Sequence, residues 1–153
     1  MTVYKDIKDL RVEDIYQLVV GKPATIHMNM ELKDAVEPML QNTISQKVYV
    51  VNDKNQLIGT ITLETILRKI GYIYGVRKPG VMSFFQFLRE ILKESVIEFM
   101  EKDPVKVTKD DKILDALKLM VTYHLNNLPV VDENDVIIGE LNGIEILMKS
   151  VQK

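Results

Sequence analysis

The chain has 153 residues, of which 46% are hydrophobic and 27% are charged, and its formal net charge at pH 7 is -2. At this length about 70% of the unfolded chain's surface can be buried, so a core forms without disulfides or metals. The near-neutral charge argues against nucleic acid as the main partner, because such binding depends on neutralising phosphates.

Cysteine is absent, which removes disulfides, thiolate catalysis and thiolate metal sites. The two histidines, His27 and His124, lie far apart without carboxylates at metal-ligand spacing. No Walker, nucleophile-elbow or paired-carboxylate motif is present, so we expect a non-enzymatic protein with no metal and no required cofactor. The N-terminus lacks the apolar core of a signal peptide, and no apolar run approaches the roughly 20 residues of a membrane helix. These features favour a cytoplasmic protein without membrane contact.

The first half of the chain contains apolar spacings typical of alternating helices and strands. Pro23 should end the first helix, and Pro38 should kink or shorten the second, because proline lacks a backbone donor. A polar turn at 52–55 joins two apolar strands into a hairpin. The expected elements, in order, are a helix at 12–19, a strand at 24–27, a helix at about 30–41, strands at 48–51 and 57–61, and a helix from about residue 62.

Residues 71–80 are rich in glycine and are predicted to form a loop. Ser83 and Gln86 then resemble a capping box at the start of a helix over about 84–94. A broad apolar stripe follows this helix and consists of Phe84, Phe85, Phe87, Leu88, Ile91 and Leu92. We expect the body of the protein or another chain to cover the stripe.

The second half of the chain repeats the first. Residues 15–40 align with 96–121 at a shift of 81, and the hairpin and the last helix align at a shift of 80. Identical pairs include Pro23/Pro104, Val50/Val130, Gly59/Gly139 and Leu67/Leu147. The shared order of helix, proline, strand, helix, hairpin and helix indicates an internal duplication.

Each repeat resembles the CBS motif, a unit that occurs in tandem pairs called Bateman modules. The resemblance rests on Leu128-Pro129-Val130-Val131-Asp132 in the second copy and, more loosely, on Val48-Tyr49-Val50-Val51-Asn52 in the first. It implies an α/β fold of two β-α-β-β-α motifs, packed face to face about a pseudo-twofold axis. The implied division is motif 1 at 12–70, a connecting loop and inserted helix at 71–95, and motif 2 at 96–150, together forming one Bateman module.

The resemblance also implies clefts between the motifs that bind an adenosine-containing ligand: AMP, ADP, ATP or S-adenosylmethionine. In the family, a Thr or Ser hydroxyl at the start of the last helix takes the phosphate, and an Asp three residues later takes the ribose hydroxyls. The matching pairs are Thr62 with Thr65 in the first copy and Asn142 with Glu145 in the second. The first copy therefore keeps the hydroxyl and lacks the carboxylate, whereas the second keeps a carboxylate and lacks the hydroxyl.

Further ligand contacts follow from the same resemblance. Backbone groups near the first strand of each copy are expected to read the base, and residues near the second strands are expected to line the cleft. The remaining predicted ligand-binding residues are Thr25, Ile26, Tyr49, Lys106, Val107, His124, Asn127 and Pro129. A plain strand or surface role remains the alternative for each of them.

The sequence thus predicts a non-catalytic regulatory sensor that binds an adenosine-containing ligand. We expect a homodimer that acts on a separate effector protein, because the chain carries no effector domain. The alternative is a ligand-free dimerisation scaffold with degenerate nucleotide sites. Direct contact with nucleic acid is not expected, because no helix-turn-helix or basic patch appears.

Overall fold

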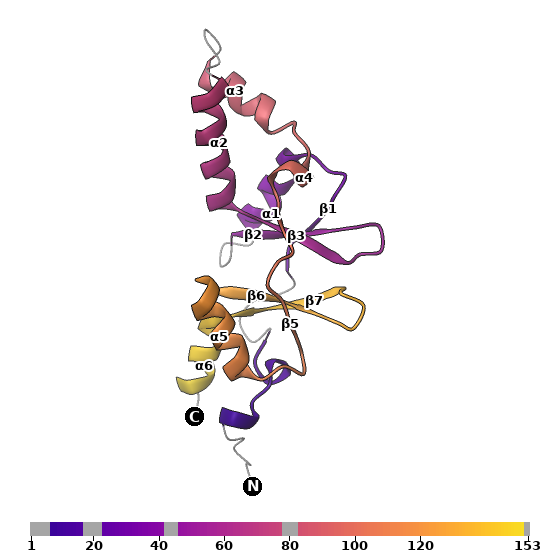
Figure 1. Ribbon diagram of the computed structural model, residues 1–153, viewed down its shortest axis with the longest axis vertical. Coiled ribbons are helices and arrows are strands. Elements are labelled where there is room, and N and C mark those ends of the chain that lie inside the picture. Colours follow the sequence, from indigo (N-terminus) through magenta and orange to yellow (C-terminus); the bar gives the residue numbers. More distant parts are fainter. Residues whose placement is uncertain (1–6, 17–22, 42–45, 78–82, 152–153) are drawn as a thin grey trace. The chain divides into compact units, whose positions relative to one another are not determined.

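The computed structural model describes residues 7–16, 23–41, 46–77 and 83–151. Contacts divide the chain into two compact units. The first-copy unit is Ala24–Pro104, and the second-copy unit is Val105–Lys153 together with Met1–Pro23. Each unit contains one β-sheet with helices packed on one of its faces (Figure 1).

The strands of the first-copy unit are β1 (Thr25–His27), β2 (Lys47–Val51), β3 (Leu57–Thr62) and β4 (Glu101–Lys102). They form one sheet in the order β1-β2-β3-β4, in which β1 is parallel to β2 and the other neighbours are antiparallel. The predicted hairpin is confirmed as β2 and β3. In its turn, Asn52 Oδ1 accepts the backbone N–H groups of Lys54 and Gln56, both at 2.9 Å.

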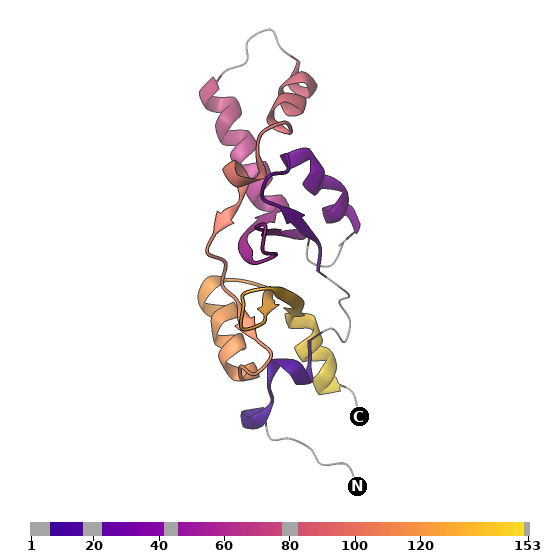
Figure 2. The same cartoon turned by 90° about the vertical axis from the view of Figure 1, so that its right-hand side faces the viewer.

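The helical segments described in this unit are η3 (Leu32–Ala35), α1 (Val36–Gln41), α2 (Leu63–Arg77), α3 (Phe84–Ile91) and α4 (Val96–Phe99). The predicted helix at about 30–41 begins as the 3-10 turn η3 and continues as α1, and Pro38 lies in the first turn of α1, where a proline is tolerated. α2 and α3 lie side by side (Figures 1 and 2). Between them, the Tyr74 ring meets Phe84 and Phe87 edge to face, at centroid distances of 5.9 and 5.3 Å.

The second-copy unit repeats this plan. Its described elements are η1 (Ile7–Asp9), η2 (Val12–Asp14), β5 (Val107–Thr108), α5 (Ile113–Tyr123), β6 (Asn127–Val131), β7 (Ile137–Asn142) and α6 (Gly143–Val151). β5 is parallel to β6, and β6 is antiparallel to β7. The register of each hairpin shifts at the matching place, Val50/Val51 in one copy and Val130/Val131 in the other, as expected for a duplication.

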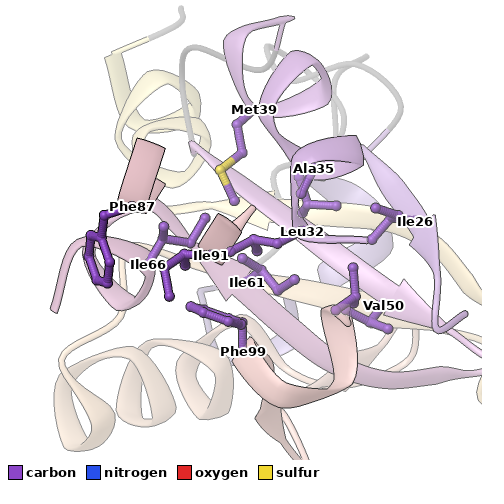
Figure 3. Close-up of a cluster of buried hydrophobic side chains, with 12 residues drawn as sticks. Ile26, Leu32, Ala35, Met39, Val50, Ile61, Ile66, Phe87, Ile91 and Phe99 are labelled. Atoms are coloured by element: carbon purple, nitrogen blue, oxygen red, sulfur yellow. The ribbon is translucent and has the colours of Figure 1, made fainter. Parts of the chain in front are cut away.

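Alternate side chains of each sheet lie on opposite faces. In the first-copy unit, Val50 and Ile61 point to the face that the helices cover and join the buried core (Figure 3). Val130 and Leu141 do the same in the second-copy unit. The opposite faces of the two sheets carry the predicted ligand-binding residues Tyr49 and Thr62 in the first copy and Asn127, Pro129 and Asn142 in the second.

The predicted loop at 71–80 is wrong, because α2 continues to Arg77. Gly71 and Gly75 lie inside this helix, although each glycine disfavours a helix by about 1 kcal/mol relative to alanine. Ile70 and Ile73 of the same segment pack against the buried core. Packing of the helix therefore outweighs the tendency of the two glycines to disfavour it. The rest of the predicted loop, residues 78–82, lies outside the described part of the chain.

The predicted helix at 12–19 is a 3-10 turn, η2, over the part that the structure describes. The backbone N–H groups of Val12 and Glu13 donate to the carbonyls of Asp111 and Lys109, at 2.9 and 3.0 Å. Hydrogen bonds to a distant segment thus hold this turn in place. An α-helix here would instead need a longer run of hydrogen bonds within the segment itself. Residues 17–22 lie outside the described residues.

The short segment that begins each copy packs in the unit of the other copy. Val12 and Ile15 are buried in the core of the second-copy unit, and Val96 and Phe99 are buried in the core of the first-copy unit. A sequence repeat and a packing unit therefore do not begin at the same residue. The division into motifs at 12–70 and 96–150 stays a prediction.

The capping box of the inserted helix is confirmed. Ser83 Oγ accepts the Gln86 N–H, and Gln86 Oε1 accepts the Ser83 N–H, both at 3.1 Å. The helix ends at Ile91 instead of about residue 94. Phe87 and Ile91 of the apolar stripe are buried, whereas Phe84 and Phe85 are 51% and 69% exposed, so the described residues cover only part of the stripe.

Gly71→Ala is expected to raise the free energy of unfolding by about 0.5–1 kcal/mol, because alanine favours a helix more than glycine does. A Cβ at this position meets no atom within 4 Å. Thermal denaturation followed by circular dichroism should show a melting temperature about 1–4 °C higher. A melting temperature below that of the wild type would contradict the exposed helical position of Gly71.

Candidate functional site

The second face of the first-copy sheet carries polar and aromatic side chains. Lys47 pairs with Thr62 across β2 and β3, and Tyr49 pairs with Thr60. Residues two apart on a strand share a face, so these four side chains lie together. Lys47, Tyr49 and Thr60 are at most 7% exposed. The Lys47 ammonium lies 5.7 Å from the centre of the Tyr49 ring, within cation–π range.

The matching face of the second-copy sheet is also polar and buried. Asn127 pairs with Asn142 across β6 and β7, and Pro129 pairs with Glu140. The side chains of Asn127 and Asn142 are each 6% exposed, and Glu140 is fully buried. Asn127 Oδ1 has no hydrogen-bond partner among the described residues.

A network of hydroxyl groups forms at the start of α2. Thr62 Oγ1 accepts the Thr65 N–H at 3.1 Å, which caps the helix. The Thr62 hydroxyl donates to Thr65 Oγ1 at 2.9 Å, and the Thr65 hydroxyl donates to Glu101 Oε1, also at 2.9 Å. The two predicted residues of the first copy are therefore in contact, and a carboxylate lies next to them.

Glu101 is a site residue that the sequence did not indicate. β4 pairs with β3 so that Glu101 lies opposite Thr60, and this pairing brings its carboxylate to Thr65. Position 65 itself lacks the carboxylate, as predicted, but another strand supplies one. No local motif marks Glu101, because 36 residues separate it from Thr65 and only folding joins them.

The start of α6 is capped by hydrogen bonds of the two predicted residues of the second copy. Asn142 Oδ1 accepts the Ile144 N–H at 3.0 Å, and Glu145 Oε1 accepts the Asn142 N–H at 2.9 Å. The Glu145 side chain is fully buried. Its carboxylate therefore stabilises the helix start at the position where the family's Asp contacts ribose.

The residues predicted near the first strands have mixed surroundings. Ile26 and Val107 belong to the buried cores, so contact with a base would fall to their backbone groups. Thr25 is exposed and pairs with Tyr49. Lys106 Nζ donates to Asp135 Oδ1 at 2.8 Å, an ion pair between two partly exposed side chains.

The two histidines have separate structural roles. His124 ends α5 in the left-handed conformation, with φ 55. His27 Nδ1 accepts the Asn29 N–H at 3.1 Å, so the other ring nitrogen, Nε2, donates to Asp53 Oδ1, and these two atoms are 2.7 Å apart. Among the residues that the structure describes, no group of three or more potential metal ligands occurs. A ligand contact at His124 stays a prediction.

The structure thus brings the predicted residues together in two groups. Tyr49, Thr62 and Thr65 lie in the first-copy unit, on or beside the polar face of its sheet. The second-copy unit groups Asn127, Pro129, Asn142 and Glu145. Within the described part of the chain, no helix is long and apolar enough to cross a membrane. The cytoplasmic location stays a prediction.

Both copies of the repeat match one protein family. The family model described as CBS domain matches residues 12–72 and 96–149, which together make up most of the chain. The chain belongs to the CBS domain family, and the resemblance and the α/β fold class expected from the sequence are both confirmed.

Two relatives come from Methanocaldococcus jannaschii. The methylated protein MJ0556 is 28% identical over 154 residues, with 98% of this chain and 76% of that protein covered. The uncharacterised protein MJ1232 is 31% identical over 123 residues, with 80% of this chain covered. The match covers only 34% of MJ1232, so the chain spans about a third of that relative's length.

Solved structures share the fold over nearly the whole chain. A CBS domain-containing protein of Thermotoga maritima is 30% identical, with a TM-score of 0.71 and 92% and 94% of the two chains covered. CBSX2, solved in complex with AMP, is 18% identical, with a TM-score of 0.69 and 94% and 97% covered. The CBS domain pair of MJ0100, solved with 5'-methylthioadenosine and S-adenosyl-L-methionine, is 19% identical, with a TM-score of 0.67 and 92% and 98% covered.

Proposed function

We propose that this protein is a non-catalytic regulatory CBS module that binds an adenosine-containing ligand on the polar sheet faces of its two copies. AMP, ADP, ATP and S-adenosylmethionine are the candidates within this class. The ligands of CBSX2 and of the MJ0100 domain pair support the class. The observation that carries the proposal is the contact of Thr62, Thr65 and Glu101 at the start of α2.

These side chains suit the two polar parts of a nucleotide. Thr62 stands at the N-terminus of the 15-residue helix α2, where free N–H groups and the helix dipole favour a phosphate. The Glu101 carboxylate is able to accept hydrogen bonds from ribose hydroxyls. For a ligand of nucleotide size, about -0.3 kcal/mol per heavy atom gives roughly -7 kcal/mol, or micromolar affinity.

The second copy offers a different set of groups at the matching place. Asn142 replaces the hydroxyl, and Glu145 provides a carboxylate within the same helix turn. One Glu145 oxygen already accepts the Asn142 N–H, and a carboxylate has further acceptor sites for a ribose hydroxyl. We therefore propose a ligand site in each copy, with different affinities.

A homodimer and a separate effector protein are the proposed partners. Apolar side chains of α2 and α6 are exposed, with Leu67 at 59% and Leu147 at 63%. Exposed apolar groups gathered on helices favour association. Ligand occupancy would then act through the dimer on the effector.

The second candidate function is a ligand-free dimerisation scaffold. The same exposed side chains favour it, and so do the internal hydrogen bonds of Thr65 and Glu145, which stabilise helix starts without a ligand. The scaffold and the sensor differ in one measurable property, namely the response of the folded protein to adenosine ligands.

Thermal denaturation with AMP, ADP, ATP and S-adenosylmethionine separates the two functions. A ligand at one hundred times its Kd adds about 2.7 kcal/mol to the free energy of unfolding. For a chain of this size the melting temperature should rise by roughly 5–10 °C. Unchanged melting curves with all four compounds at millimolar concentration would exclude the sensor and favour the scaffold.

Glu101→Gln is expected to weaken binding at the first copy by about tenfold or more, because a hydrogen bond to a charged group contributes about 1.5–3 kcal/mol. The glutamine oxygen still accepts the Thr65 hydroxyl, so the fold should be kept. Glu98→Gln is the matched control, since Glu98 is an exposed carboxylate on the neighbouring helix α4. Equal affinities of the two variants in calorimetric titration would remove Glu101 from the site.

A further inference from the structure

Most of α2 and all of α3 lie between the two aligned copies of the repeat. The alignment ends at Leu67 in the first copy and begins again at Val96. α2 and α3 lie side by side and extend beyond the sheet of their own unit (Figures 1 and 2). The duplication therefore does not account for α3, and its exposed side chains are candidates for a role of their own.

Three exposed aromatic residues form a continuous surface on these helices, which we call the aromatic ridge: Tyr74 of α2 and Phe84 and Phe85 of α3. They are 47%, 51% and 69% exposed. The ring centroids of Tyr74 and Phe84 are 5.9 Å apart, those of Phe84 and Phe85 are 6.2 Å apart, and both pairs meet edge to face. Because the rings hold one another in place, the ridge offers apolar contact area at a low cost in side-chain entropy.

The two helices and the turn between them are basic, although the chain as a whole is slightly acidic. Residues 63–91 have a net charge of +3, and the remaining residues have a net charge of -5. The charged residues of this segment are Arg68, Lys69, Arg77, Lys78 and Arg89 against Glu64 and Glu90.

Arg89 places part of this charge beside the aromatic ridge. It follows Phe85 by four residues in α3, so the two side chains are neighbours on the helix surface. Arg68 is already paired with Glu64 at 2.7 Å. Arg89, in contrast, is exposed and forms no ion pair with the residues that the structure describes. An apolar surface with a cation at its edge is complementary to an acidic partner that also carries apolar groups.

The charge and composition also distinguish between other occupants. A second copy that presented the same ridge would bring two segments of net charge +3 together, and like charges disfavour this contact. Recognition of anionic lipids usually takes a cluster of about four to eight basic residues, whereas the basic residues here are spread over two helices and one of them is paired. Aromatic residues and arginine are enriched in the centres of protein–protein interfaces.

We propose that the aromatic ridge is the docking site of the effector protein, and that the effector binds it through an acidic segment with apolar side chains. The apolar side chains of that segment cover the three rings, and its carboxylates lie beside Arg89. This assignment rests on the proposed function, in which a separate effector responds to the ligand. It gives the effector a surface distinct from the polar sheet faces.

Fluorescence anisotropy with two designed helical peptides tests the proposal. Both peptides carry leucine on one face, and the remaining positions are glutamate in one peptide and lysine in the other. The glutamate peptide is expected to bind about tenfold or more tightly than the lysine peptide, because the segment around the ridge is basic. Added salt should reduce this difference, since it screens exposed charges.

Two variants connect the binding to the ridge. Phe85→Ser should weaken the glutamate peptide by about tenfold or more, and Arg89→Glu should weaken it by about threefold or more. The matched controls are Tyr123→Ser and Lys109→Glu, which make the same kinds of change at exposed positions of the second-copy unit. Both controls should bind the glutamate peptide as the wild type does.

Equal affinities of the two peptides, or no binding of either at millimolar concentration, would overturn the proposal. Binding to phosphatidylglycerol vesicles that is lost in Phe85→Ser would overturn it in favour of a lipid surface. A dimer that dissociates in Phe85→Ser, measured by analytical ultracentrifugation, would overturn it in favour of a second copy. Calorimetric titration of AMP into the same variants should give the wild-type affinity, so a failure of the docking site is distinguishable from a failure of the ligand site.

Discussion

Gly59→Val is expected to lower the free energy of unfolding by about 3 kcal/mol, at the upper end of the usual effect of overpacking. A Cβ on Gly59 would lie 2.5 Å from Met100 Sδ and 3.0 Å from the Glu101 carbonyl oxygen. The methionine side chain is able to move, but the carbonyl belongs to β4, whose Lys102 pairs with Gly59. The larger valine would therefore push β4 away from β3.

This substitution also tests the link between the fold and the site, because β4 carries Glu101. The melting temperature should fall by roughly 6–12 °C, and the remaining folded protein should bind nucleotide more weakly. Gly71→Ala is the matched control, since that glycine has open space around it. If Gly59→Val melts like the wild type, the close approach of β3 and β4 is not present in solution.

Glu145→Ala is expected to lower the free energy of unfolding by about 2–3 kcal/mol. The substitution removes a fully buried carboxylate that accepts the Asn142 N–H at the start of α6. A hydrogen bond to a charged group is worth about 1.5–3 kcal/mol, and the abandoned N–H adds a desolvation cost. Urea denaturation should show the loss as a lower midpoint with an unchanged slope.

Glu145→Gln separates the structural role of this side chain from its role toward a ligand. The amide oxygen still accepts the Asn142 N–H, so we expect a stability loss of about 1 kcal/mol or less. Ligand binding should nevertheless weaken, because the charge is lost.

Glu145→Ala is expected to weaken ligand binding more than Thr65→Ala does, because Glu101 supplies the carboxylate beside Thr65. Equal effects of Glu145→Ala and Thr65→Ala on affinity would contradict the assignment of Glu101 as the carboxylate of the first copy.

The parts of the fold that could be predicted are those in which local pattern and tertiary environment agree. The apolar runs of β2 and β6, the turn at Asn52 and the capping box at Ser83 each have a local physical cause, and each occurs where expected. Local preference failed at Gly71 and Gly75, where packing of Ile70 and Ile73 extends α2 through two glycines.

Of the candidate site, the sequence predicted the helix starts but not the group that completes the first of them. Thr62, Thr65, Asn142 and Glu145 lie at fixed spacing in the repeat, so a motif is sufficient to find them. Glu101 reaches Thr65 only through the pairing of β3 with β4, a two-residue strand without a pattern of its own. Contacts between distant segments carry no local signal, so the sequence shows that position 65 lacks a carboxylate but does not show that Glu101 lies beside it.

Calorimetric titration of AMP into the wild-type protein tests the central claim most directly, since it measures the proposed adenosine site without relying on a change in stability. Saturable binding in the micromolar range is predicted from the size of the ligand. Affinity should fall by about tenfold or more in Glu101→Gln and stay unchanged in Glu98→Gln. The absence of saturable heat at millimolar AMP, ATP and S-adenosylmethionine would contradict the claim that this CBS module binds an adenosine ligand.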